Sequence, residues 1–392
     1  MTRFAALLLL GWLTNPALQA APYTPSDDTR VLERLPLRAA DPAARELAAL
    51  RARWRSAPRD PAAAAALARR LFQLAGVDGD PRHVGHAQAA LEPWSADPSP
   101  PPAVRIARAA ILQYGHHFDA ALSDLQAAAM AEPDEPEAHA WIAAIHLVRA
   151  DYDDARAACH RLADLAEPLI GVACIATVDS LTGQAAAASR TLRDALRREG
   201  GAEPAQRLWA LTRLAEIDER RGAHVEAEAA YREALSLGLR DVYLRAAYAD
   251  FLLDRRRPAE VLALLSDDGA RADVLLLRLA IAAKATGDAR VAGWTRELQA
   301  RFDATQARRD TTHRKEEARF ALELLGQAQR AFVLARDNYA VQREYADARM
   351  LLEAALAAGQ RAGAEPVRQW MTRTRIEAPA LAALVARLEA AK

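Results

Sequence analysis

Small apolar residues recur along the chain at a regular interval. The segments HHFDAALSDLQAAAMAEPDEP and ADYDDARAACHRLADLAEP show the interval most clearly, because Ala121 and Ala155 occupy equivalent places in them and are 34 residues apart. Within each unit the eighth and twentieth positions are usually Ala, and Gly lies near the fifteenth. A small residue on each of two helices lets their backbones approach, and Gly allows the chain to reverse between them. The pattern therefore predicts a series of helix-turn-helix units.

The repeating unit can be followed through most of the sequence. Because one helical hairpin cannot bury its own apolar face, successive units must stack to form a continuous core. The frames from 169 to 208 and from 273 to 312 contain about five extra residues each, which predicts longer loops. We expect units that begin near residues 65, 102, 136, 169, 208, 242, 273, 312 and 345. Ala fills the eighth position at Ala109, Ala143, Ala176, Ala215, Ala249 and Ala280, and the twentieth at Ala121, Ala155, Ala188, Ala227, Ala292, Ala331 and Ala364.

This unit resembles the tetratricopeptide repeat (TPR), a helix-turn-helix of about 34 residues, over roughly residues 60 to 375. Most of the aromatic positions of that family carry Ala or Leu here, and Tyr231 is one of the few retained. The resemblance implies an all-α fold, a right-handed α-solenoid of about nine helical hairpins. It also implies a concave groove that holds peptides or partner proteins.

The first twenty residues have the composition of a secretory signal segment. They read MTRFAALLLLGWLTNPALQA, with a single Arg3, an apolar run and then small residues that end at Ala20. The apolar run is shorter than the roughly 20 residues that cross a bilayer, and no later stretch reaches that length, so we expect no membrane span. Abundant Ala and the use of Arg for nearly all cations indicate a bacterial source. We therefore expect cleavage near Ala20 and a periplasmic or secreted protein.

The segment that follows is rich in Pro and polar residues and is expected to be extended, before a first helix from Pro42 to about Trp54. It either docks along the repeats through Leu32 and Leu35 or stays free as a tail. At the other end, Pro379 opens an amphipathic stretch with a row of Leu on one face. The expected parts are a signal peptide at 1–20, the N-terminal segment and first helix at 21–60, the repeats at 61–375, and a C-terminal capping helix at 376–392 with Leu381, Leu384 and Leu388 inward.

Charge and motifs narrow the classes of function. Acidic and basic residues balance at 52 each, so no net field would attract nucleic acid or an anionic membrane. The sequence contains no HExxH, GxSxG, GxGxxG or GxxxxGK[ST] motif. We therefore predict a non-enzymatic scaffold that binds a protein or peptide in its groove and needs no cofactor. Two alternatives stay open: a metal-handling or catalytic envelope protein that uses scattered histidines, and a self-associating structural module of an envelope complex.

Histidine is the residue type that would support a metal or catalytic site, because imidazole binds zinc and titrates near neutral pH. The adjacent His116 and His117 fall in the turn of a repeat, where a solvated role is favoured. No Cys or carboxylate stands at ligand spacing from His83 and His86, so that pair is a weak candidate. The other candidates are His139 and His146 on one helix face, with His160 on the paired helix.

Cys159 and Cys174 are the two cysteines of the chain. Export would place them where disulfides persist, and their frame positions lie on helices that pack side by side. A bridge would close a loop of about 15 residues and contribute around 3 kcal/mol in the chain-entropy model. We predict the disulfide over the alternative of two buried thiols.

The TPR resemblance assigns inward positions that form an acidic and aromatic patch. The second position of two neighbouring frames carries Trp209 and Tyr243. Aromatic faces beside carboxylates suit an extended segment that carries Arg or Lys. The alternative is that these acids pair with Arg220 and Arg245 inside the scaffold. The residues expected to line the groove are Trp209, Glu216, Glu219, Tyr243, Asp250 and Asp254.

Overall fold

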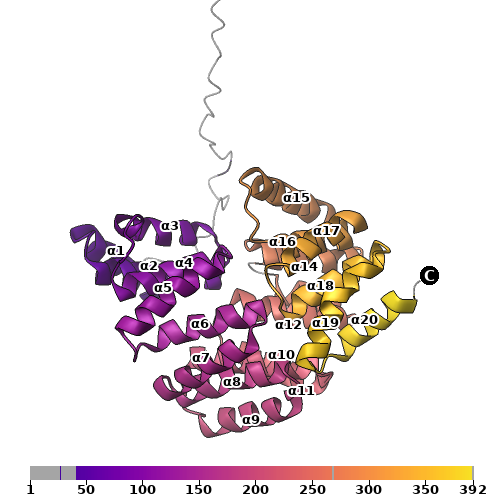
Figure 1. Ribbon diagram of the computed structural model, residues 1–392. Helices are drawn as coiled ribbons and strands as arrows, with labels where there is room; N and C mark the ends of the chain where they lie inside the picture. The colour runs from indigo at the N-terminus through magenta and orange to yellow at the C-terminus, as the bar shows by residue number, and fades with distance from the viewer. Residues whose placement is uncertain (1–26, 28–40, 267–268, 391–392) are drawn as a thin grey trace, which may run out of the picture.

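The computed structural model describes residue 27, residues 41–266 and residues 269–390. These residues form helices and loops and no strand (Figure 1). The expectation of an all-α protein built from repeated, adjacent helices is confirmed for this part of the chain. The predicted signal peptide at 1–20 and, apart from Asp27, the segment before residue 41 lie outside it. None of the described helices is long and apolar enough to cross a membrane.

The helices follow one another in pairs whose members contact each other, such as α4 with α5, α6 with α7, α8 with α9 and α10 with α11. Three short helical segments, η1 to η3, interrupt the series, and η2 is a π-helical turn. The bounds are α1 Pro42–Ser56, α2 Pro61–Asp78, α3 Arg82–Ala90, η1 Glu92–Trp94, α4 Pro102–Tyr114, α5 Phe118–Ala131, α6 Pro136–Arg149, α7 Tyr152–Leu165, α8 Pro168–Leu181, α9 Ala185–Arg198, α10 Pro204–Arg220, α11 His224–Ser236, α12 Val242–Asp254, α13 Pro258–Leu264, α14 Asp273–Thr286, α15 Val291–Ala307, α16 Arg314–Arg319, η2 Phe320–Leu324, α17 Ala328–Tyr339, α18 Tyr345–Ala357, η3 Arg361–Ala364, α19 Glu365–Thr374 and α20 Pro379–Ala390.

Helix starts and ends follow local sequence signals. Proline occupies the first turn of α1, α2, α4, α6, α8, α10, α13 and α19, where its missing N–H costs no helical hydrogen bond. The side chains of Asp41, Asp60 and Asp241 accept hydrogen bonds from backbone N–H groups at the starts of α1, α2 and α12. Gly79 and Gly287 end α2 and α14 in the left-handed conformation that Gly adopts without a steric cost.

The recurring small residues lie where paired helices approach. Ala121 and Ala155 are fully buried, as are most of the other Ala residues at the eighth and twentieth positions. At Gly171 an added Cβ would lie 2.6 Å from the Cα of Ala163, so α7 and α8 touch closely enough to require Gly there. Ala292 is an exception, because it is exposed near the start of the long helix α15, which packs through Leu298 and Phe302 instead.

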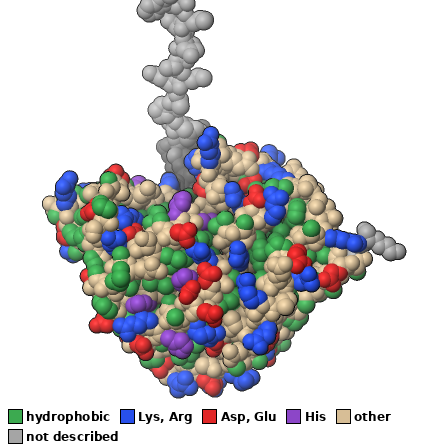
Figure 2. All heavy atoms as spheres, viewed as in Figure 1, with side chains coloured by type: hydrophobic (Ala, Val, Ile, Leu, Met, Phe, Trp, Pro, Cys, Tyr) green, Lys and Arg blue, Asp and Glu red, His purple; other side chains and the backbone are tan. Residues whose placement is uncertain are grey.

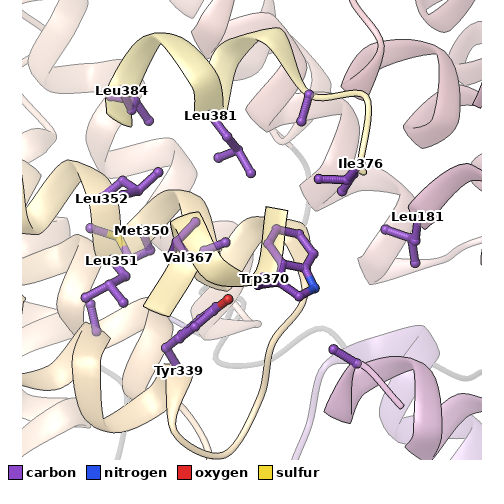
Figure 3. Packing of buried hydrophobic residues seen from close by; sticks show 14 of the residues in the cluster. Leu181, Tyr339, Met350, Leu351, Leu352, Val367, Trp370, Ile376, Leu381 and Leu384 are labelled. Atoms are coloured by element: carbon purple, nitrogen blue, oxygen red, sulfur yellow. The ribbon is translucent and has the colours of Figure 1, made fainter. Parts of the chain in front are cut away.

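The helix array curves back on itself, so that its C-terminal part packs on its middle. One hydrophobic cluster combines buried residues of α7 and α8 with those of α17 to α20 (Figure 3). In Figure 3, Leu181 of α8 faces Trp370 and Ile376 across the junction. The indole Nε1 of Trp370 donates to the hydroxyl of Tyr152 at 3.1 Å. The backbone N–H of Arg343 donates to the carbonyl of Val148 at 2.7 Å.

Two further contacts complete the arrangement. Helix α2, near the start of the array, contacts α12 in its middle. The last helix, α20, buries Leu381, Leu384 and Leu388 and contacts α18. The inner face of the array is therefore surrounded by protein on several sides (Figure 1).

Candidate binding cavity

The closure of the array leaves a cavity of about 1040 Å³ at its inner face. Helices α10, α12, α14 and α18, together with α16 and η2, form most of the wall, and α2, α8 and α20 add residues at its edges. This volume slightly exceeds the usual range for small-ligand sites, which is roughly 300–1,000 Å³. The lining combines acidic, basic and apolar side chains. On the face of the molecule drawn in Figure 2, charges of both signs are interspersed without one dominant patch.

The two aspartates of α12 bind arginines from later helices. Asp250 Oδ2 accepts from Arg278 Nη2 and Asp250 Oδ1 from Arg319 Nη1, each at 2.5 Å. Asp254 accepts from both Nη atoms of Arg349, with Nη2 at 2.7 Å from Oδ1. Burial alone would raise the pKa of Asp250, but the two guanidinium groups outweigh it and hold the pKa well below the ordinary value. These aspartates are therefore engaged by α14, α16 and α18 of the same chain.

Tyr243 presents an uncovered aromatic ring to the cavity. It exposes 52% of its surface, although it lines an inner wall. Its hydroxyl donates to Glu216 Oε1, and the Arg213 guanidinium lies 4.8 Å from the centre of its ring. Arg213 Nη1 is also 3.1 Å from Glu216 Oε2. The three side chains form a charged and aromatic surface that keeps one ring face available for contact.

Glu219 lies deeper and is held by a hydroxyl group. The hydroxyl of the fully buried Tyr231 donates to Glu219 Oε2 at 2.8 Å. Burial, which the hydrogen bond from Tyr231 only partly offsets, raises the pKa of Glu219 to about 7, and the neighbouring carboxylates of Asp254, Asp250 and Glu216 add to the rise. This carboxyl group therefore changes charge near neutral pH.

Five of the six residues expected to line the groove lie in the cavity wall, namely Glu216, Glu219, Tyr243, Asp250 and Asp254. Trp209 does not line it among the described residues; it packs, partly buried, against two hydrophobic clusters. Its indole is therefore used in packing between repeats and not at the inner wall. The alternative partners expected for the acids, Arg220 and Arg245, are not the ones observed. The cations that bind Glu216, Asp250 and Asp254 are Arg213, Arg278, Arg319 and Arg349.

Cys159 of α7 and Cys174 of α8 form a disulfide in the structure, with their Cα atoms 5.4 Å apart. Both residues are buried in the hydrophobic cluster that joins the middle of the array to its C-terminal part. The bridge therefore fixes two neighbouring repeats at the junction on which the array closes.

The histidines are distributed over separate sites. His116 lies in the loop before α5, and burial together with the nearby His313 lowers its pKa to about 4. His83 Nε2 lies 3.6 Å from Asp78, and His146 Nδ1 lies 3.6 Å from Asp151. Across the described ranges, no three His, Cys, Asp or Glu side chains are placed to hold a metal ion.

Sequence reasoning missed the cations of the cavity. Arg319 is 69 residues from Asp250, and Arg349 is 95 residues from Asp254. No local pattern pairs residues at such separations. The one available signal is the basic run RRDTTHRKEE, which contains Lys315, a residue of the cavity wall.

No protein-family model matches the chain, and no curated protein matches it in sequence.

Proposed function

We propose that this protein is an exported, non-enzymatic scaffold of the TPR type that binds a peptide segment of a partner protein in its central cavity. The observation that carries the proposal is Tyr243, which exposes 52% of its surface inside the molecule, on the wall of a cavity of about 1040 Å³. An aromatic ring that is uncovered at an inner wall is a typical anchor for a partner.

The chemistry of the wall supports an extended peptide as the ligand. An extended backbone needs both donors and acceptors, and the wall presents Arg213 and Glu216 beside Tyr243. Apolar side chains of α12 and α14, such as Ala246, Leu253 and Val274, lie in the same wall and suit apolar side chains of a ligand. The absence of a common catalytic motif in the sequence supports binding over catalysis.

Site-specific photo-crosslinking tests this proposal. Tyr243 is replaced by benzoylphenylalanine in the full chain, expressed in the native host, and the products are mapped by mass spectrometry. The matched control carries the same group at Val225, which is 82% exposed on α11. We expect Tyr243 to capture a defined segment of another protein and Val225 not to do so. Identical products at both positions, or products within the chain alone, would contradict the proposal.

A second measurement quantifies the same contact. A synthetic peptide of the captured segment is titrated into wild-type protein and into Tyr243→Ala. Because a central aromatic anchor contributes at least about 1–2 kcal/mol, we expect the variant to bind roughly tenfold more weakly. Equal affinity in a variant that keeps its helical circular dichroism would remove Tyr243 from the site.

A further inference from the structure

Arg220 differs from the other buried or half-buried cations of the cavity wall. Arg213, Arg278, Arg319, Arg349 and Lys315 each have a carboxylate oxygen within 4.0 Å. For Arg220 the described residues supply no carboxylate within that distance, although the residue exposes only 8% of its surface. Its neighbour Asp218 binds Ser189, Arg193 and Arg221 instead.

The two side chains that contact Arg220 directly are neutral. Its Nη2 donates to the hydroxyl of Ser180 at 2.6 Å, and its guanidinium lies 5.9 Å from the centre of the Tyr345 ring. Its Nε is buried and has no hydrogen-bond partner within the described part of the chain. Ser180 uses its own hydrogen on the carbonyl of Thr177. Arg220 therefore lines the cavity with no counter-charge and with one donor unused.

Two acids lie in the same region as Arg220 but do not neutralise its positive charge. Glu219 and Asp254 both influence Tyr345 electrostatically, as Arg220 does. However, Glu219 accepts from Tyr231, and Asp254 is held by both Nη atoms of Arg349. A buried charge without a counter-charge is unfavourable, so an anion that entered the cavity would gain an ion pair with Arg220.

The guanidinium of Arg220 and the side chains of the wall determine which class of anion can bind there. One guanidinium provides paired N–H donors that match a planar carboxylate, whereas a phosphate group with a charge near −2 would need further donors. The same wall also carries aliphatic and thioether side chains from α8, α10, α18 and α20, which can contact the apolar part of a ligand. These side chains are Leu181, Ile217, Met350 and Leu384, with Leu147 of α6.

We propose that Arg220 binds the carboxylate of an amphiphilic monocarboxylate whose apolar body lies against these side chains. The carboxylate can belong to a free small molecule or to the C-terminus of a peptide with an apolar last residue. This site does not depend on the proposed contact at Tyr243.

Calorimetric titration of the full chain with octanoate tests the inference, and octanol serves as the neutral probe with the same chain length. We expect saturable octanoate binding that is at least about tenfold tighter than octanol binding, because only octanoate supplies the counter-charge. Arg220→Gln should lose that difference. Arg198→Gln, which removes an exposed Arg from α9, should keep it.

A peptide arm distinguishes the two sources of the carboxylate. A short acetylated peptide that ends in Leu is compared as the free acid and as the amide. If only the free acid binds, and only when Arg220 is present, the natural source is a chain terminus. Equal binding of octanoate and octanol together with equal binding of acid and amide would overturn the inference, and so would carboxylate binding that Arg220→Gln leaves unchanged.

A conservative variant covers the case in which Arg220→Gln does not fold. Arg220→Lys keeps the positive charge but loses the planar pair of N–H donors. We expect it to bind the carboxylate probe more weakly than wild-type protein and octanol equally well. Unchanged affinity for the carboxylate probe in this variant would show that the guanidinium of Arg220 does not hold the anion.

Discussion

At the scale of single residues, the carboxyl groups of the cavity differ in their partners and therefore in their pKa. Asp250 has two arginines and a pKa held well below its ordinary value. Glu219, one residue before the end of α10, accepts a hydrogen bond from a tyrosine hydroxyl and has a pKa raised to about 7. The difference arises because a guanidinium stabilises the ionised carboxylate, whereas burial beside other carboxylates stabilises the protonated acid.

The raised pKa of Glu219 predicts a pH dependence of stability. The folded protein binds this proton more tightly than the unfolded chain does, so the free energy of unfolding should fall as pH rises from about 4.5 to about 7. The upper limit is about 3 kcal/mol for a shift of this size, and water in the cavity reduces it. Burial also raises the pKa of Asp347 to about 7, so the two acids contribute in the same window.

Urea unfolding of wild-type protein and Glu219→Gln between pH 4.5 and pH 8 checks this prediction. The variant should lose part of the pH dependence and should be the more stable protein at pH 8. The remaining slope belongs to Asp347 and to other titrating groups. Identical pH profiles for the two proteins would contradict the assignment of a raised pKa to Glu219.

At the scale of elements, α7 and α8 show how small residues and a disulfide act together. Gly171 lets α8 approach Ala163 of α7, and Cys159 and Cys174 join the same two helices. Close packing and a covalent link at one interface restrict how these repeats can rotate against each other. The pair also carries Tyr152 and Leu181, which contact the C-terminal part of the array.

Loss of this disulfide should therefore be costly. The bridge spans a sequence separation of 15 residues, for which the chain-entropy model gives about 3 kcal/mol. We expect reduction of wild-type protein to lower the free energy of unfolding by roughly that amount, while a Cys159→Ala, Cys174→Ala variant should not respond to reductant. Thiol counting on protein from its native compartment is the direct check, and two titratable thiols there would count against the bridge.

The elements could be predicted from the sequence because their signals are local. Ala at the eighth and twentieth positions, Gly at the turns and Pro in the first turns mark individual helices, so the expected starts near 102, 136 and 242 lie on α4, α6 and α12. Ala292 shows where the repeat pattern does not predict burial. It fits the repeat frame but is exposed, because α15 is longer than its counterparts and packs through other residues.

At the scale of the whole molecule, closure of the array changes what the inner acids do. A stacked array without closure would leave Asp250 and Asp254 open to a basic partner, as the sequence suggested. Here Arg319 and Arg349 of later helices bind them instead. Sequence reasoning placed five of the six groove residues in one wall, but it could not supply their partners, because closure depends on contacts between residues 69 to 218 positions apart.

The Asp254–Arg349 pair should therefore contribute to holding α12 and α18 together. Both side chains are partly buried, with 20% and 30% of their surfaces exposed, and they bind through two hydrogen bonds. A double-mutant cycle with Asp254→Asn and Arg349→Met, measured by urea unfolding, should give a coupling free energy of about 1–3 kcal/mol. Arg349 also binds Glu353 of its own helix, so the cycle isolates the contact between helices from that local one.

The Glu365–Arg368 pair is the matched control, because it has the same chemistry but lies on the solvent-exposed face of one helix, α19. Its cycle should show no measurable coupling, since exposed pairs separated by one turn add little in water. If the two cycles gave the same result, the Asp254–Arg349 contact would not contribute to closure. A coupling confined to Asp254 and Arg349 would instead show that this buried pair helps to hold α12 and α18 together, so that Asp254 serves the architecture of the closed array.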